Sequence, residues 1–174
     1  QAALPLYRAD KLGASAWAET VILTEGEHDA DSGASLGLLT TTAGGTGTLS
    51  QKHVECLAGR PIVIVAHGDA AGRAEAEKRA ALLDGAGKSN YGDSSSSVSR
   101  WTPQNDKRAA ASVKIIEVPG SKDLAEAVDK GFTLELVEAL IADAREWRPA
   151  TGADLLREAE RQIGRFVVIE PNEM

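Results

Sequence analysis

Two short acidic segments each follow an apolar run and lead into a helical pattern. The first reads TEGEHDAD, with Glu25 where the apolar run ends and Asp29 in what should be the first helical turn. The second reads HGDAAGR, which places His67 and Asp69 in the same kind of turn. Carboxylates at such turns are suitable ligands for divalent cations that prefer oxygen donors, and imidazole also binds Mn²⁺.

The elements that must position these residues alternate along the chain. Short β-rich runs bounded by turn residues occupy 21–24, 61–65 and 113–118, with a weaker run at 36–42. Helical patterns occupy 28–36, 50–59, 70–85, 121–131 and 133–147. Strands that alternate with helices predict an α/β, Rossmann-like fold, with a mostly parallel sheet of about four strands flanked by helices.

The same pattern predicts where the acidic residues meet. Open parallel sheets bind ligands beyond the carboxyl ends of their strands, and the first and third strands are commonly neighbours there. We therefore expect Glu25, Asp29, His67 and Asp69 to converge. Clustered carboxylates repel one another unless a cation neutralises them, which favours a site for Mg²⁺ or Mn²⁺. Stabilisation of these acids by the helix dipole alone remains the alternative.

Composition limits the possible functions. The 174 residues carry a net charge of −7, so any contact with DNA or RNA is expected to be local rather than driven by the overall charge. The only cysteine, Cys56, excludes an intrachain disulfide, favours a reducing, cytoplasmic location, and is expected to be a small core residue. The chain has no run of about 18 apolar residues, so we expect no membrane span.

Two further segments are rich in glycine. Gly44 and Gly45 precede a helix and could bind a phosphate through backbone N–H groups, although a tight turn without a ligand is the default explanation. The segment near 85–110 is rich in Gly and Ser and lacks periodicity, which predicts a flexible surface insertion.

The two acidic segments resemble the signatures of the Toprim domain, which bacterial-type primases, topoisomerases and some nucleases share. That family has Glu-Gly after its first strand and Asp-x-Asp-x-x-Gly-Arg after its third, and VIVAHGDAAGRAEAEKRAALL is similar to the second pattern. PGSKDLAEAV resembles a segment of the primase-like members in which a Lys-Asp pair recurs. The resemblance covers about residues 20–147, in the right order.

The resemblance implies roles for individual residues. Catalysis would involve Glu25 and Asp69, and metal binding would involve Glu25, Asp29, Asp69 and His67. Contacts with nucleotide or nucleic acid would involve Gly44, Gly45, Arg73, Lys122 and Asp123. His67 is the departure, because it stands where the family has the first Asp. It could bind Mn²⁺, leave a site for one metal only, mark a degenerate site, or merely hydrogen-bond a neighbouring carboxylate.

The resemblance also implies a function. We expect a Toprim domain from a primase or primase–helicase of a phage- or plasmid-type mobile element, which joins nucleotides on a single-stranded DNA template with the help of Mg²⁺ or Mn²⁺. Residues 1–19 would be an N-terminal flank from a longer chain, and 148–174 a helix and strand that link to a helicase or ATPase domain. A non-catalytic Toprim module that binds DNA or a helicase, and a Toprim nuclease, remain alternatives.

Overall fold

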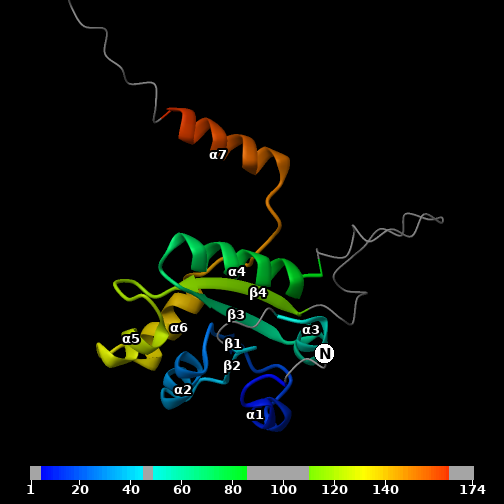
Figure 1. Ribbon diagram of the computed structural model, residues 1–174, viewed down its shortest axis with the longest axis vertical. Coiled ribbons are helices and arrows are strands. Elements are labelled where there is room, and N and C mark those ends of the chain that lie inside the picture. The colour runs from blue at the N-terminus through cyan, green and yellow to red at the C-terminus, as the bar shows by residue number, and fades with distance from the viewer. Residues whose placement is uncertain (1–4, 45–48, 86–109, 165–174) are drawn as a thin grey trace, which may run out of the picture.

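A four-stranded sheet forms the centre of the protein (Figure 1). The computed structural model describes residues 5–44, 49–85 and 110–164. The strands lie in the order β2-β1-β3-β4 and every pair is parallel. Their bounds are Val21–Leu23 for β1, Thr40–Thr41 for β2, Pro61–Ala66 for β3 and Ser112–Glu117 for β4. The predicted α/β fold is confirmed, and the sheet is parallel throughout.

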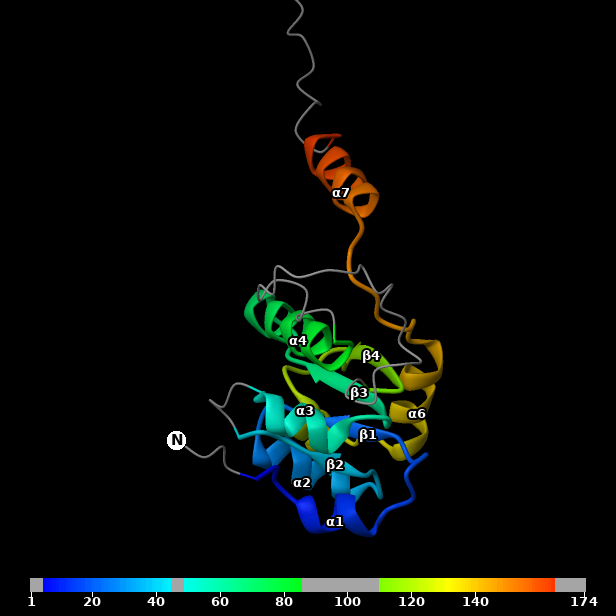
Figure 2. The ribbon, with the colours of Figure 1, turned by 90° about the vertical axis from the view of Figure 1, so that its right-hand side faces the viewer.

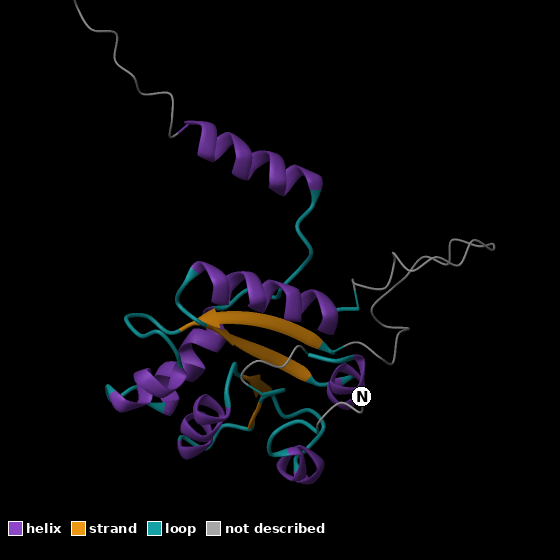
Figure 3. Cartoon of the chain, in the orientation of Figure 1, coloured by secondary structure: helices purple, strands orange, loops and turns teal. Residues whose placement is uncertain are grey.

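Helices cover both faces of this sheet (Figures 2 and 3). Their bounds are Ala9–Ala14 for α1, Glu27–Ser35 for α2, Gln51–Leu57 for α3, Ala70–Leu83 for α4, Leu124–Asp129 for α5, Leu134–Asp143 for α6 and Gly152–Gly164 for α7. Helices α1, α3 and α4 share one hydrophobic core with the sheet, and α5 and α6 share a second core on the opposite face. None of the described helices is long and apolar enough to cross a membrane.

The two cores explain why the strands read as continuous apolar runs. In β1, Val21 and Leu23 belong to the first core and Ile22 to the second. In β3, Ile62 and Ile64 alternate with Val63 and Val65 in the same way. Successive side chains point to opposite faces, so a strand covered on both faces needs apolar residues at every position.

The neighbouring strands β1 and β3 bring distant segments to one edge of the sheet. Their register pairs Leu23, the last residue of β1, with Ile64, two residues before the end of β3, so the carboxyl ends of both strands lie at the same edge of the sheet. A buried arginine on α4 reinforces this arrangement. Arg79 donates from its Nη1 to the carbonyl oxygen of Thr24 (3.2 Å) and pairs through Nε with Glu75 (3.4 Å), as the helical spacing of that pair predicts. A buried guanidinium is tolerated here because its N–H groups have acceptors.

Neighbouring segments of the chain form backbone contacts with both edge strands of the sheet. Beyond β2, the backbone N–H of Tyr7 donates to the carbonyl oxygen of Thr42 (2.9 Å). Beyond β4, Lys114 forms an antiparallel bridge with Glu146, and the backbone N–H of Trp147 donates to the carbonyl oxygen of Val113 (2.7 Å). Edge strands with free backbone groups invite unwanted pairing, and these segments remove that opportunity.

Some elements differ from the sequence expectation. The weak run at 36–42 contributes only Thr40–Thr41, because Gly37, with φ 92°, turns the chain before it. The helix expected at 121–131 begins later, at Leu124, because Asp123 caps it. Helix α1 was not expected. Cys56 is exposed, so the prediction that it is a core residue is wrong. Most of the expected insertion near 85–110, and the strand expected after α7, lie outside the described residues.

The start of α4 lies so close to the end of β3 that position 72 has no room for a side chain. A Cβ at Gly72 would lie 2.3 Å from the Cβ of His67 and 2.9 Å from its Cα and carbonyl oxygen. Backbone atoms cannot easily move aside, so Gly72→Ala should lower the free energy of unfolding by about 1–3 kcal/mol. Urea denaturation measures this.

A matched control is Gly13→Ala in α1, where an added Cβ meets nothing within 4 Å. Alanine favours the helix, so this variant should leave the free energy of unfolding unchanged or raise it by up to about 1 kcal/mol. An equal effect of the two substitutions would contradict the close packing of α4 against β3.

Candidate functional site

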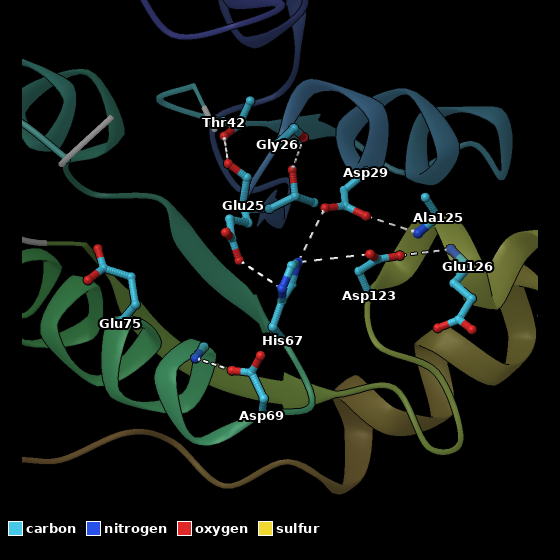
Figure 4. Close-up of polar contacts among 12 residues, drawn as sticks. Glu25, Gly26, Asp29, Thr42, His67, Asp69, Glu75, Asp123, Ala125 and Glu126 are labelled. Atoms are coloured by element: carbon cyan, nitrogen blue, oxygen red, sulfur yellow. Dashed lines mark hydrogen bonds and ion pairs between the residues drawn. The ribbon is translucent and has the colours of Figure 1, made fainter. Parts of the chain in front are cut away.

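The imidazole of His67 lies among three carboxylates beyond the ends of β1 and β3 (Figure 4). Its Nδ1 lies 3.1 Å from Oε2 of Glu25. Its Nε2 lies 4.0 Å from Oδ2 of Asp29 and 4.0 Å from Oδ2 of Asp123. Glu25 follows β1, Asp29 belongs to the first turn of α2, and Asp123 precedes α5. We call these four side chains the acidic crevice.

In both Asp29 and Asp123, one carboxylate oxygen accepts a backbone hydrogen bond and the other faces the crevice. Oδ1 of Asp29 accepts a hydrogen bond from the backbone N–H of Ala125 (3.0 Å), which ties α2 to α5. Oδ1 of Asp123 accepts from the backbone N–H of Glu126 (2.8 Å) and caps α5. In both residues Oδ2 is the oxygen that faces His67. The two hydrogen bonds therefore fix the orientation of both carboxylates.

Buried threonines position Glu25. The hydroxyl of Thr42 donates to the carbonyl oxygen of Glu25 (2.8 Å) and accepts from the backbone N–H of Gly44 (3.2 Å). The hydroxyl of Thr24 donates to the carbonyl oxygen of Gly26 (3.0 Å). These threonines were not among the predicted site residues, although polar residues within β-rich runs were the available signal. Gly44 thus lies beside the crevice, whereas Gly45 lies outside the described residues.

Asp69 has a different role from the other acids. Its Oδ1 accepts a hydrogen bond from the backbone N–H of Gly72 (2.7 Å), which caps α4. This hydrogen bond is the main reason that the pKa of Asp69 is lowered, and the positive charge of Lys122 acts in the same direction. The cap therefore stabilises the fold above the ordinary Asp pKa, and its contribution is lost as the pH falls through the lowered value.

The two basic side chains predicted to contact nucleic acid, Arg73 and Lys122, differ in whether they are already paired. Arg73 pairs with Glu117 (2.9 Å) at the end of β4 and also donates to the carbonyl oxygen of Gly68 (3.3 Å). The backbone of Lys122 lies beside the turn after β3, because its carbonyl oxygen accepts from the backbone N–H of Gly68 (3.0 Å). The side chain of Lys122 is exposed and forms no ion pair with a described residue. Lys122 is therefore the better placed of the two to meet an incoming phosphate.

The donor types suit Mg²⁺ or Mn²⁺, but their arrangement does not. Among the described residues, no group of three or more His, Cys, Asp or Glu side chains is arranged to hold a metal ion. The imidazole of His67 lies between the carboxylates that would have to share the ion. Asp29, Asp69 and Asp123 also each use one oxygen to accept a backbone N–H. Glu25, Asp29 and Asp123 could share an ion only if the imidazole moved away.

Comparisons with known proteins support the fold. No family model matches the chain, and no curated protein does. The E. coli primase catalytic core matches with a TM-score of 0.57 and 19% identity, over 90% of this chain and 43% of that one. A DnaG primase catalytic domain bound to single-stranded DNA matches with a TM-score of 0.54 and 17% identity, over 81% and 40% of the two chains.

A third match is a DNA primase domain from Pseudomonas aeruginosa, with a TM-score of 0.51 and 16% identity, over 91% of this chain and 41% of that one. The chain spans less than half the length of these primase structures. At this level of identity the likeness concerns the fold. The chain shares the fold of these primase catalytic structures, with a parallel four-stranded sheet flanked by helices.

Proposed function

We propose that this chain is the Toprim domain of a DNA primase and takes part in primer synthesis on single-stranded DNA. The observation that carries the proposal is the meeting of Glu25, Asp29 and Asp123 around His67, at the carboxyl edge of a sheet that has the fold of primase catalytic cores. This edge is where open parallel sheets bind their ligands. The match to a primase domain bound to single-stranded DNA supports the choice of template.

The finer part of the proposal concerns the parent protein. The sequence flanks resemble those of phage- and plasmid-type primase–helicases. We therefore propose a mobile-element primase in which a helicase or ATPase domain belongs to the same chain. The negative net charge supports this arrangement, because the domain alone has little general attraction for a template and would depend on other parts of the parent chain to hold it.

Within the crevice, Glu25 is the acid best placed to meet a substrate. Its side chain is 37% exposed, against 11% for Asp29 and 21% for Asp123. A carboxylate at this position can accept the proton of a 3′-hydroxyl, provided that the substrate oxygen comes within hydrogen-bonding distance. Asp69 is exposed at the start of α4, and the positive charge of Lys122 lies near enough to help lower its pKa.

Primer synthesis by the parent protein tests the proposal. Glu25→Gln and Asp69→Asn should each lower primer yield by about tenfold or more, because a positioned group that accepts a proton commonly contributes about 10²–10⁴ in rate. Both changes keep the shape of the side chain, and Asn caps helices as well as Asp does, so a loss would report the missing charge.

Matched controls are Glu19→Gln, between α1 and β1, and Asp129→Asn, at the end of α5. Both residues are exposed and lie outside the crevice, so both variants should keep full activity. Unchanged primer yield in both Glu25→Gln and Asp69→Asn would refute the catalytic role.

The position of His67 favours a second candidate function, a Toprim module that positions DNA or a helicase without itself catalysing transfer. Each carboxylate of the crevice already has an internal partner, and the place of a shared cation is filled. Nucleotidyl transfer at such a negatively charged site requires a cation to neutralise the triphosphate. No comparable observation favours the nuclease alternative.

Calorimetry with MnCl₂ distinguishes the two candidates. If the domain only positions DNA or a helicase, the native chain should show no saturable Mn²⁺ binding, and His67→Asp should create one site, because the substitution removes the imidazole and adds a hard oxygen ligand. The control His28→Asp adds the same charge at an exposed position of α2 and should bind no ion. Equal binding by the native chain and His67→Asp would show that the imidazole does not displace the metal, and would favour the catalytic candidate.

A further inference from the structure

Helix α7 stands apart from the rest of the protein (Figures 1 and 2). It carries two adjacent apolar side chains in solvent, with Leu155 63% exposed and Leu156 67% exposed. An isolated helix of 13 residues is marginal in water and usually depends on packing of its apolar side. Leu155 and Leu156 are therefore available for a partner.

The sequence nevertheless specifies this helix locally. The backbone N–H of Thr151 donates to Oδ2 of Asp154 (2.9 Å), and the backbone N–H of Asp154 donates to the hydroxyl of Thr151 (3.3 Å). Asp154 also pairs with Arg157 (3.5 Å). Reciprocal capping of this kind fixes where a helix begins. The chain thus holds α7 as a helix without covering its leucines.

A second feature without a partner lies between α1 and α3. Here the surface encloses a cavity of about 460 Å³, which falls in the range of binding cavities. Leu6, Leu12 and Trp17 give it apolar walls, and Cys56 lies on its α3 side. The indole of Trp17 is 59% exposed and stacks on the guanidinium of Arg60, 4.5 Å from the ring centroid.

The charges around the cavity and on the helix are complementary. Lys52 lines the cavity and forms no ion pair with a described residue. The buried Arg60 also lines it, and its Nε has no hydrogen-bond partner among the described residues. On α7, Glu160 likewise forms no ion pair with a described residue. Glu160 follows Leu156 by four positions, so the two share one side of the helix. The apolar side of α7 is therefore bordered by the acidic Glu160, and the apolar cavity is bordered by the basic Lys52 and Arg60.

We propose that α7 of one copy of this chain inserts Leu155 and Leu156 into the α1–α3 cavity of a second copy, with Glu160 beside Lys52. Docking of an amphipathic helix in an apolar groove is a common mode of recognition. The exchange is reciprocal, so it gives a closed dimer with two equivalent contacts.

The occupant comes from a second copy because α7 cannot easily reach the cavity of its own molecule. The backbone of Trp147 is hydrogen-bonded to β4, and only residues 148–151 separate it from α7. In both ribbon views α7 lies beyond α4, on the side of the molecule opposite to α1. A helix of the same chain would have to cross α4 and α3.

Light scattering after size-exclusion chromatography tests the proposal on the 174-residue chain. The native chain at micromolar concentration should have twice its monomer mass of 18.2 kDa. The double variant Leu155→Asp/Leu156→Asp should have the monomer mass, because it places two charges in an apolar contact. The control Leu136→Asp, at a 48% exposed leucine of α6, should keep the dimer mass. A monomeric native chain, or a dimer that survives the double variant, would overturn the proposal.

Cys56 provides a second test, because it is the only cysteine and lies exposed beside the cavity. Mild oxidation of Leu155→Cys should give a covalent dimer on a non-reducing gel, which reducing agent converts to monomer. Leu136→Cys should give no such dimer under the same conditions. Equal crosslinking of the two variants, or a disulfide confined to one chain, would contradict docking between two copies.

Discussion

The parallel pairing of β1 with β3 is the contact on which the rest of the structure depends. Strands that run side by side in the same direction end at the same edge, so Glu25 and His67 leave the sheet together. A buried arginine reinforces the pairing at this edge, because Arg79 binds the last carbonyl before Glu25. At the other end of β3, Arg60 donates to the carbonyl oxygen of Leu12 (2.8 Å) and so ties α1 to the start of the strand. Without this pairing the acidic residues would not meet.

Three carboxylates in one crevice would be unstable without compensating positive charge or hydrogen-bond donors. The structure provides them from several sources. The imidazole of His67 faces all three acids, and backbone N–H groups of α5 donate hydrogen bonds to Asp29 and Asp123. These groups hold the carboxylates in place without a cation. Gly72 lies close to the Cβ and the backbone of His67, which links the position of His67 to the start of α4.

Much of this arrangement could be predicted because it depends on local patterns. Apolar runs identified β1, β3 and β4, and the acidic turns after β1 and β3 identified Glu25, Asp29 and His67 as neighbours. The place of Asp123 depends instead on a contact between α2 and α5, which are far apart in sequence. The sequence therefore suggested a nucleotide contact for Asp123, whereas the structure groups it with the acids. Cys56 was misjudged for a similar reason, since its exposure depends on how α1 packs beside α3.

The crevice and the α1–α3 cavity lie at opposite ends of β3. Arg60 precedes the strand and lines the cavity, whereas His67 follows it and occupies the crevice. At a rise of about 3.3 Å per residue, the six residues between them span roughly 20 Å. A helix bound in the cavity would therefore leave the crevice open to a template. The two sites are nevertheless linked beside β3, because Leu6 lines the cavity, the backbone of the next residue, Tyr7, is hydrogen-bonded to Thr42, and Thr42 donates to the carbonyl oxygen of Glu25 in the crevice. A helix that fixes Leu6 in the cavity would therefore also steady the backbone that positions Glu25.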